Sequence, residues 1–74
     1  MKKVSVRAET PANVWQIRCA VGERVEPGQE LVILESMKME IPIEAPVAGV
    51  VRELPAKEGS PVKEGDVVAV IDAE

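Results

Sequence analysis

The sequence predicts a small all-β domain, and two observations carry this prediction. The chain has 74 residues, and its large aliphatic residues are 13 Val, 5 Ile and 3 Leu, so most are β-branched. Such side chains lose rotamer freedom in a helix and fit a pleated sheet. Six Pro and five Gly interrupt the chain at short intervals, and no stretch keeps a helical period. At this length we expect one domain, residues 1–74, with one modest core.

Short apolar runs between turn residues locate the individual strands. We expect strands near residues 3–8, 14–19, 29–36, 39–45, 50–55 and 66–72, with short strands near 24–25 and 61–62. The segment Glu26-Pro27-Gly28-Gln29 suits a type II turn, because Pro fixes φ at its second position and Gly supplies a positive φ at its third. Residues 63–66 form the corresponding turn, with Gly65 third.

The chain also repeats itself. A shift of 37 residues aligns the two halves without a gap. The aligned pairs are Val14 with Val51, Ile17 with Leu54, Gly22 with Gly59, Val25 with Val62, Gly28 with Gly65, Leu31 with Val68, Ile33 with Val70, Leu34 with Ile71, and Glu35 with Asp72. Neither half can bury its apolar face alone, so we predict two similar units packed together around an approximate twofold axis.

Each half departs once from strict alternation. The apolar positions concerned are Val14, Ile17 and Cys19 in the first half and Val51, Leu54 and Ala56 in the second. A three-residue step breaks the two-residue period of a strand, which predicts a β-bulge in each half. The alignment of Cys19 with Ala56 favours a small core residue over a nucleophile. The alignment of Trp15 with Arg52 predicts a partly outward side chain, with packing over a loop favoured over ligand stacking.

One lysine stands out, in the segment Glu35-Ser36-Met37-Lys38-Met39-Glu40. An apolar run precedes it and an alternating run follows it, which predicts a hairpin with Lys38 at its tip. A lone surface lysine is usually a solvated charge, and methionines near a strand end are usually core filler. The repeat favours a special role, because only the first half carries this segment. Its counterpart would begin at Ala73, so the tip should lie opposite the two termini.

Composition disfavours several other functions. The net charge is −4, the basic residues are scattered and the chain has one aromatic residue, which disfavours nucleic-acid binding. No apolar segment is long enough to span a membrane, and no signal peptide is recognisable. With a single cysteine, these features predict a cytoplasmic protein. The chain has no histidine, so we expect neither a metal site nor a Cys–His catalytic pair.

With these motifs in hand, the chain closely resembles the biotinyl/lipoyl attachment domains, and among them the biotin carboxyl carrier type. Ser36-Met37-Lys38-Met39 matches the family's small residue followed by Met-Lys-Met, and residues 45–49 match its A-P-x-x-G motif. The structural turn positions of the family stand here as Gly22, Gly28, Gly49, Gly59 and Gly65.

The resemblance implies a fold, a modification and partners. The fold is a flattened β-barrel, or barrel-sandwich hybrid, of two four-stranded antiparallel sheets. Lys38 would receive biotin as an amide on its side-chain nitrogen. A biotin protein ligase would read the flanking residues Glu35, Ser36, Met37, Met39 and Glu40. The biotinyl arm would then swing between biotin carboxylase and carboxyltransferase sites of acetyl-CoA carboxylase or a related enzyme. The chain itself would be a carrier without an active site.

The sequence departs from the family in two ways. Ala12 stands at the position that corresponds to Gly49, and the neighbouring Asn13 is the candidate to supply a positive φ there. Some bacterial carriers of acetyl-CoA carboxylase have an inserted loop in the first half, and the gap-free repeat predicts none here. This second departure weakens the assignment to that particular carboxylase.

Two alternatives stay open. The same lysine could carry lipoate, alone or besides biotin, for a dehydrogenase-type complex. Lipoyl domains more often have Asp-Lys-Ala at the tip, so Met37 and Met39 favour biotin. The other alternative is a plain interaction module with an unmodified lysine. Four acidic residues also flank the tip, which suits either a basic partner surface or an ordinary solvated face: Glu30, Glu35, Glu40 and Glu44.

Overall fold

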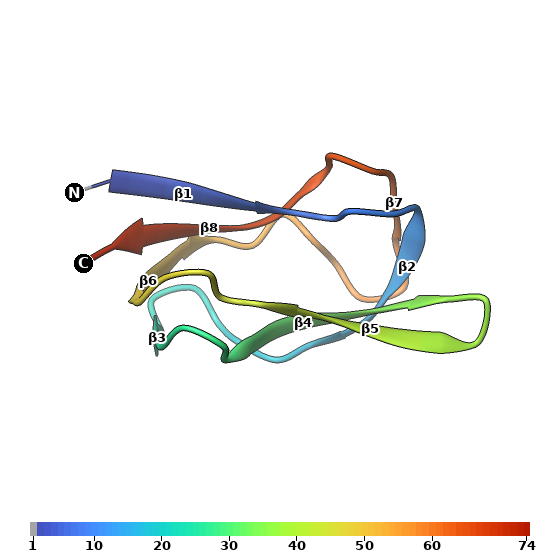
Figure 1. Ribbon diagram of the computed structural model, residues 1–74, viewed down its shortest axis with the longest axis horizontal. Coiled ribbons are helices and arrows are strands. Elements are labelled where there is room, and N and C mark those ends of the chain that lie inside the picture. Colours follow the sequence, from blue (N-terminus) through green and yellow to red (C-terminus); the bar gives the residue numbers. More distant parts are fainter. Residues whose placement is uncertain (1) are drawn as a thin grey trace.

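The computed structural model describes residues 2–74, and these residues form eight β-strands and no helix (Figure 1). The strands are β1 (Lys2–Arg7), β2 (Ala12–Ile17), β3 (Arg24–Val25), β4 (Glu30–Ser36), β5 (Met39–Glu44), β6 (Gly49–Glu53), β7 (Pro61–Val62) and β8 (Val67–Ala73). They form two four-stranded sheets, ordered β1-β8-β6-β3 and β5-β4-β2-β7, in which every pairing is antiparallel. The predicted fold class is confirmed, and the strand ends agree with the predicted ones to within two residues.

The internal repeat is visible in the topology. Adding 37 to the bounds of β1, β3 and β4 gives those of β5, β7 and β8, and β2 maps onto β6 with one residue to spare. Each sheet takes its two inner strands from one half of the chain and its two edge strands from the other. The halves therefore interlock, since neither can complete a sheet without the other. The connections 18–23 and 54–60 have nearly equal lengths, so the described first half holds no inserted loop.

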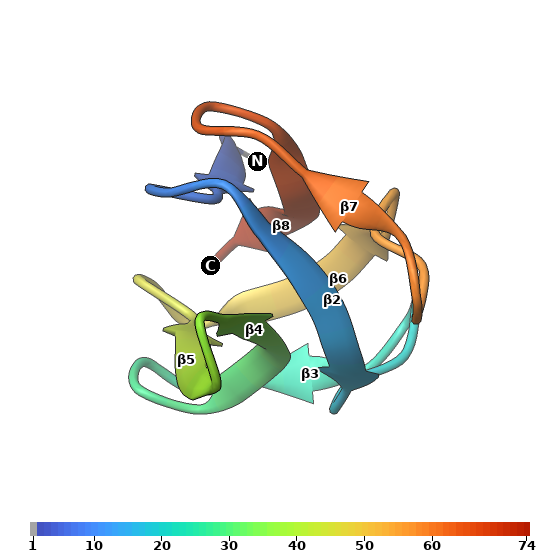
Figure 2. The same ribbon diagram turned by 90° about the vertical axis from the view of Figure 1, so that its right-hand side faces the viewer.

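The core fills the space between the two sheets, which Figure 2 shows from the end that carries the β4–β5 turn. Its largest fully buried side chains are Leu31, Leu34, Ile71, Val14, Val25, Val32, Val51 and Val68. Fully burying one such side chain contributes about 1.5–3 kcal/mol. Cys19 lies in the same cluster, as does Ala56, so its prediction as a small core residue is confirmed.

Four β-bulges shape the sheets, two in each half. The register between β2 and β4 shifts at Trp15, and the register between β6 and β8 shifts at Arg52, as predicted. The Trp15 side chain is 42% exposed, in agreement with its partly outward placement. Two further bulges, at Leu31 and Val68, were not predicted. Both residues are fully buried, and each bulge lets two consecutive side chains of an inner strand join the core.

The two type II turns are confirmed. The Gln29 N–H donates to the Glu26 carbonyl at 3.1 Å, and Gly28 between them has a φ of 87°. In the second half the Asp66 N–H donates to the Lys63 carbonyl at 3.0 Å, and Gly65 has a φ of 89°. Gly22 and Gly59 have similar positive φ values in two further turns of the same kind.

Gly49 is not a turn residue, which corrects the expectation for this position. Its φ is not positive, and neither is that of Asn13 in the other half. Gly49 is the first residue of β6 and is already paired with Ala73 of β8, so the chain does not reverse there. A Cβ at Gly49 would lie 2.1 Å from the carbonyl oxygen of Asp72. The glycine is therefore needed for the close approach of two backbones, a different requirement from positive φ.

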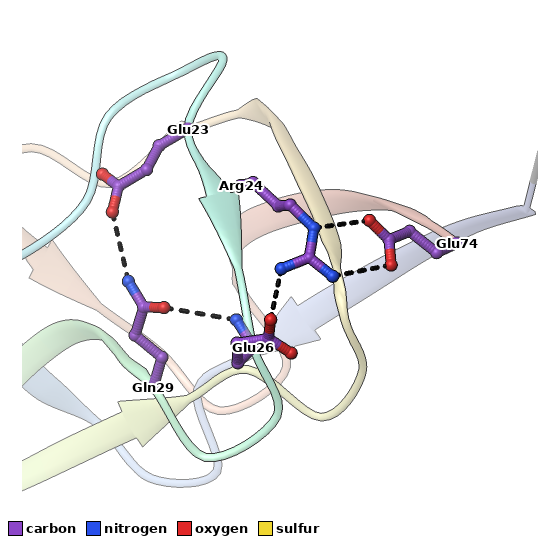
Figure 3. Close-up of polar contacts among 5 residues, drawn as sticks. All are labelled: Glu23, Arg24, Glu26, Gln29 and Glu74. Carbon is purple, nitrogen blue, oxygen red and sulfur yellow. Dashed lines mark hydrogen bonds and ion pairs between the residues drawn. The ribbon is translucent and has the colours of Figure 1, made fainter.

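A polar network holds the end of β8 against β3 (Figure 3). The Arg24 guanidinium donates two hydrogen bonds to Glu74, at 2.6 and 2.8 Å, and a third to Glu26. The bond from Arg24 holds the pKa of Glu74 below its usual range. The pair is present at neutral pH and is lost when acid protonates Glu74, and its exposure limits its contribution to stability. Gln29 extends the network by accepting from the Glu26 N–H and donating to Glu23.

This network and the β4–β5 turn lie at opposite ends of the molecule. The principal extents of the molecule are 36 × 18 × 17 Å, and Figure 1 shows the turn at one end of the long axis and both chain ends at the other. The predicted placement of the tip opposite the termini is confirmed.

We predict that Gly49→Ala destabilises the fold more than Gly28→Ala. The new methyl group at position 49 meets backbone that cannot move aside, and the cost should approach about 3 kcal/mol, the upper end for overpacking. At Gly28 a new methyl group would meet no atom within 4 Å beyond its chain neighbours, so only the left-handed backbone is unfavourable, at about 1–2 kcal/mol. Urea unfolding of the two variants measures the difference, with Gly65→Ala as the repeat-matched control. Equal costs at positions 28 and 49 would contradict the assigned role of Gly49.

Candidate functional site at the hairpin tip

The tip is the tightest hairpin connection that two antiparallel strands commonly have. Pairing between β4 and β5 continues through Glu35 with Glu40 to Ser36 with Met39. Only Met37 and Lys38 remain to reverse the chain, and their φ values are 51° and 65°. Two loop residues with positive φ define a type I′ turn, whose twist matches that of the flanking strands. The predicted hairpin with Lys38 at its tip is present.

The turn is built from unsuitable residues. Type I′ turns favour Asn and Gly, because a side chain with a Cβ costs about 1–2 kcal/mol in the left-handed region. Met37 and Lys38 are the only residues other than glycine with positive φ in the described chain. The backbone ladder of β4 and β5 holds them there. Strain of this kind gathers at functional sites, where the surrounding structure over-determines the conformation.

Lys38 has a fixed backbone and a free side chain. The residue is exposed, and within residues 2–74 no ion pair or hydrogen bond involves its amine. No acceptor in this part of the chain is therefore placed to take a proton from Nζ. Any reaction of the amine requires a base from another molecule.

Two methionines beside the lysine face solvent. The exposed fraction is 91% for Met37 and 62% for Met39, so neither is core filler. Met37 is the most exposed large apolar side chain among the described residues. Flexible thioether side chains at a protruding tip are suited to contact with another protein.

Carboxylates face one another across the same hairpin. Glu35 pairs with Glu40 beside the turn, and Glu30 pairs with Glu44 at the far end of the strands. All four residues are exposed. Like charges directly opposite on neighbouring strands are destabilising, so this arrangement does not serve stability. The hairpin therefore carries two carboxylates beside the turn that holds Lys38 and two more at its other end.

The remaining chemistry of the described chain is sparse. Burial raises the pKa of the Cys19 thiol, and the charge of Glu23 raises it further, so the thiol is a poor nucleophile. Among residues 2–74 no group of three His, Cys, Asp or Glu side chains is placed to hold a metal ion. The same residues include no helix that is long and apolar enough to cross a membrane.

An open groove of about 560 Å³ runs between β1 and β5, which are one edge strand of each sheet. Its lining includes Ile41, Pro42 and Arg7, and the Arg7 guanidinium donates to the Gly65 carbonyl at 2.8 Å. Pro42 has no N–H, so it blunts the free edge of β5 as a template for another strand.

The structure gathers one part of the predicted site and disperses the other. Residues 35–40 all lie on one hairpin, around Lys38. The five glycines predicted as turn residues lie elsewhere and act on the fold. Sequence reasoning missed the left-handed pair at the tip, and it named the four glutamates without their direct opposition across the hairpin. The two-residue gap between the strands was a usable signal for the first.

Comparisons with known proteins agree with this geometry. Residues 3–71 match the Biotin_lipoyl family model, described as biotin-requiring enzyme. The chain is 48% identical over 65 residues to the biotin/lipoyl attachment protein of Bacillus subtilis, a match that covers 88% of this chain and 89% of that protein. It is 46% identical over 66 residues to the biotinylated protein TB7.3 homolog of Mycobacterium leprae, covering 89% and 93%.

A solved structure extends the similarity to a large enzyme. The urea carboxylase of Kluyveromyces lactis superposes with a TM-score of 0.91 at 35% sequence identity. The match covers 97% of this chain and 6% of that one. The chain thus spans nearly the whole length of its small relatives and a small portion of the carboxylase.

We predict that Met37→Asn stabilises the protein. Asparagine tolerates the left-handed region, so the variant should gain about 0.5–1 kcal/mol and melt at a higher temperature. Met39→Asn is the matched control, because Met39 lies within β5 and asparagine is unfavourable in a strand. Thermal unfolding by circular dichroism measures both. A lower melting temperature for Met37→Asn than for the natural chain would contradict the strain at the tip.

Proposed function

The chain belongs to the biotin/lipoyl attachment family, and on this premise we propose that it is a biotin carrier whose acceptor is the Nζ atom of Lys38. The observation that carries the proposal is the position of this lysine. It stands at the second residue of a strained two-residue turn, exposed, at the far end of the long axis from the termini. An amine in this position is accessible to the active site of another enzyme while the rest of the domain stays outside.

Attachment is a simple acyl transfer. The neutral Nζ attacks the carbonyl of an activated biotinyl group, a C–N bond forms, the activating group leaves and the nitrogen gives up a proton. Because no described residue forms a hydrogen bond or an ion pair with the Lys38 amine, we assign both the base and the activated acyl group to the biotin protein ligase. The product is an uncharged amide, so the net charge of the chain goes from −4 to −5.

The tip residues serve contact with the ligase. Met37 and Met39 give it two exposed apolar side chains on either side of the acceptor, and Glu35 and Glu40 add negative charge to the strands that lead into the turn. Ser36 pairs with Met39 and closes the ladder below the turn. The rigid ladder fixes the spacing of all five residues relative to Lys38.

The proposed partners are a biotin carboxylase and a carboxyltransferase. Bound biotin supplies a carrier for a carboxyl group between two such sites. The similarity to a small portion of urea carboxylase supports the role of a carrier unit that serves larger catalytic parts. We propose no active site on the chain itself, and the cytoplasmic location stays a prediction.

Lipoate on Lys38 is the second candidate. The relative from Bacillus subtilis is named for both groups, and an exposed amine on a tight turn suits either acyl chain. The flanking methionines are the feature that favours biotin. The two candidates share the site and differ in the ligase and the partner complex.

We predict that Lys38→Arg abolishes labelling by a biotin protein ligase supplied with biotin and ATP. The guanidinium keeps the positive charge and is not acylated, so labelling followed by mass spectrometry should fall below detection. The matched controls are Lys57→Arg and Lys63→Arg, because both lysines are exposed and each is the first residue of a turn. These variants should be labelled at the natural rate. Labelling of Lys38→Arg at another lysine would refute the assignment.

We further predict that the double change Met37→Asp and Met39→Ala moves labelling from a biotin ligase toward a lipoyl ligase. Both side chains are exposed, so we expect no large loss of stability. Initial rates with each ligase and the melting temperature are the measurements. An unchanged ratio of the two rates would remove the methionines from ligase selection, and a large loss of stability would mean that a change in rate reports unfolding and not ligase selection.

A further inference from the structure

The oxidisable sulfur atoms within residues 2–74 are unevenly exposed. Met37 and Met39 are 91% and 62% exposed, whereas Cys19 is only 9% exposed. A thioether reacts with a peroxide without first losing a proton, so its exposure to solvent decides how fast it is oxidised. A thiol must first become a thiolate, and burial of Cys19 together with the charge of Glu23 opposes this. Peroxide should therefore attack the tip before the core.

We propose that Met37 is an oxidation site at which a hydroperoxide switches off the acceptor function of the tip, with Met39 reacting more slowly. The inference rests on the proposed function and adds a form of regulation to the same site. The Met37 sulfur attacks one peroxide oxygen, an S–O bond forms and the O–O bond breaks. The sulfur is oxidised by two electrons to the sulfoxide, and hydrogen peroxide is reduced to water. Methionine sulfoxide reductases reverse the change.

The location of Met37 makes its oxidation consequential for the acceptor. It shares the two-residue turn with Lys38, so any enzyme that reaches Nζ also meets the Met37 side chain. A sulfoxide replaces an apolar surface with a strong hydrogen-bond acceptor, and burying it in an apolar contact without a partner is unfavourable. This penalty corresponds to a decrease in labelling rate of about tenfold or more.

The same location protects the fold from the reaction. Met37 lies outside the hydrophobic core cluster and is almost fully exposed. Oxidation should therefore leave the melting temperature nearly unchanged. A loss of labelling without a loss of stability would distinguish a local effect at the tip from general oxidative damage.

The experiment uses the full-length unmodified protein and hydrogen peroxide. Peptide mapping by mass spectrometry follows the gain of one oxygen at each methionine over time. Samples are then labelled with biotin protein ligase, biotin and ATP, before and after treatment with a mixture of the two sulfoxide reductases. The variants are Met37→Leu, Met39→Leu and the double variant, each compared with its own untreated sample. The double variant retains Met1, Cys19 and Trp15 and so controls for every other oxidisable residue.

We expect Met37 to be oxidised first, and labelling of the oxidised natural chain to fall about tenfold or more and to return after reduction. Met39→Leu should stay sensitive, whereas Met37→Leu and the double variant should keep their rates within about twofold. Natural-rate labelling of the oxidised chain, or equal sensitivity of Met37→Leu, would overturn the inference. Absence of labelling in the untreated protein would instead refute the proposed function, while the mapping would still decide which methionine reacts first.

Discussion

Backbone pairing between β4 and β5 continues to the last residue of β4 and the first residue of β5, and the geometry of the tip depends on it. Once Ser36 is paired with Met39, only two residues are left to reverse the chain, and both adopt a left-handed conformation. The rest of the molecule holds this pairing in place. β4 is an inner strand whose residues Leu31–Leu34 are all buried, and β2 pairs with its other side. The lysine is thus presented by a turn whose position the core determines.

The residues between the two sheets stabilise the fold, whereas several features of the tip destabilise it. Between the sheets, closely packed β-branched side chains and bulges at repeated positions favour stability. At the tip, non-glycine residues occupy left-handed backbone, glutamates oppose one another and methionines face water. Local rules are commonly broken at functional sites, where the loss of stability is offset elsewhere. The interlocked halves supply that offset, because each sheet needs strands from both.

Much of the fold could be predicted from the residues, because its signals are local or repeated. The turns at Gly28 and Gly65 follow from four-residue sequences, and the bulges at Trp15 and Arg52 follow from a break in alternation that occurs twice. The bulges at Leu31 and Val68 left no such signal. Both lie in continuous apolar runs, where a shift of register does not change the order of apolar and polar residues. The role of Gly49 depends on the Asp72 carbonyl, which is distant in sequence and near only in the folded chain.

The site shows the same division. Lys38 and its neighbours could be found from the sequence because they are contiguous, but the opposition of Glu35 to Glu40 requires the register of the strands. The central claim is that this lysine carries a biotinyl group. The most direct test is the intact mass of the protein isolated from its native cells, followed by fragmentation to locate any added group. We expect the mass of one biotinyl amide on Lys38. An unmodified mass, a lipoyl mass or a group on another lysine would contradict the claim.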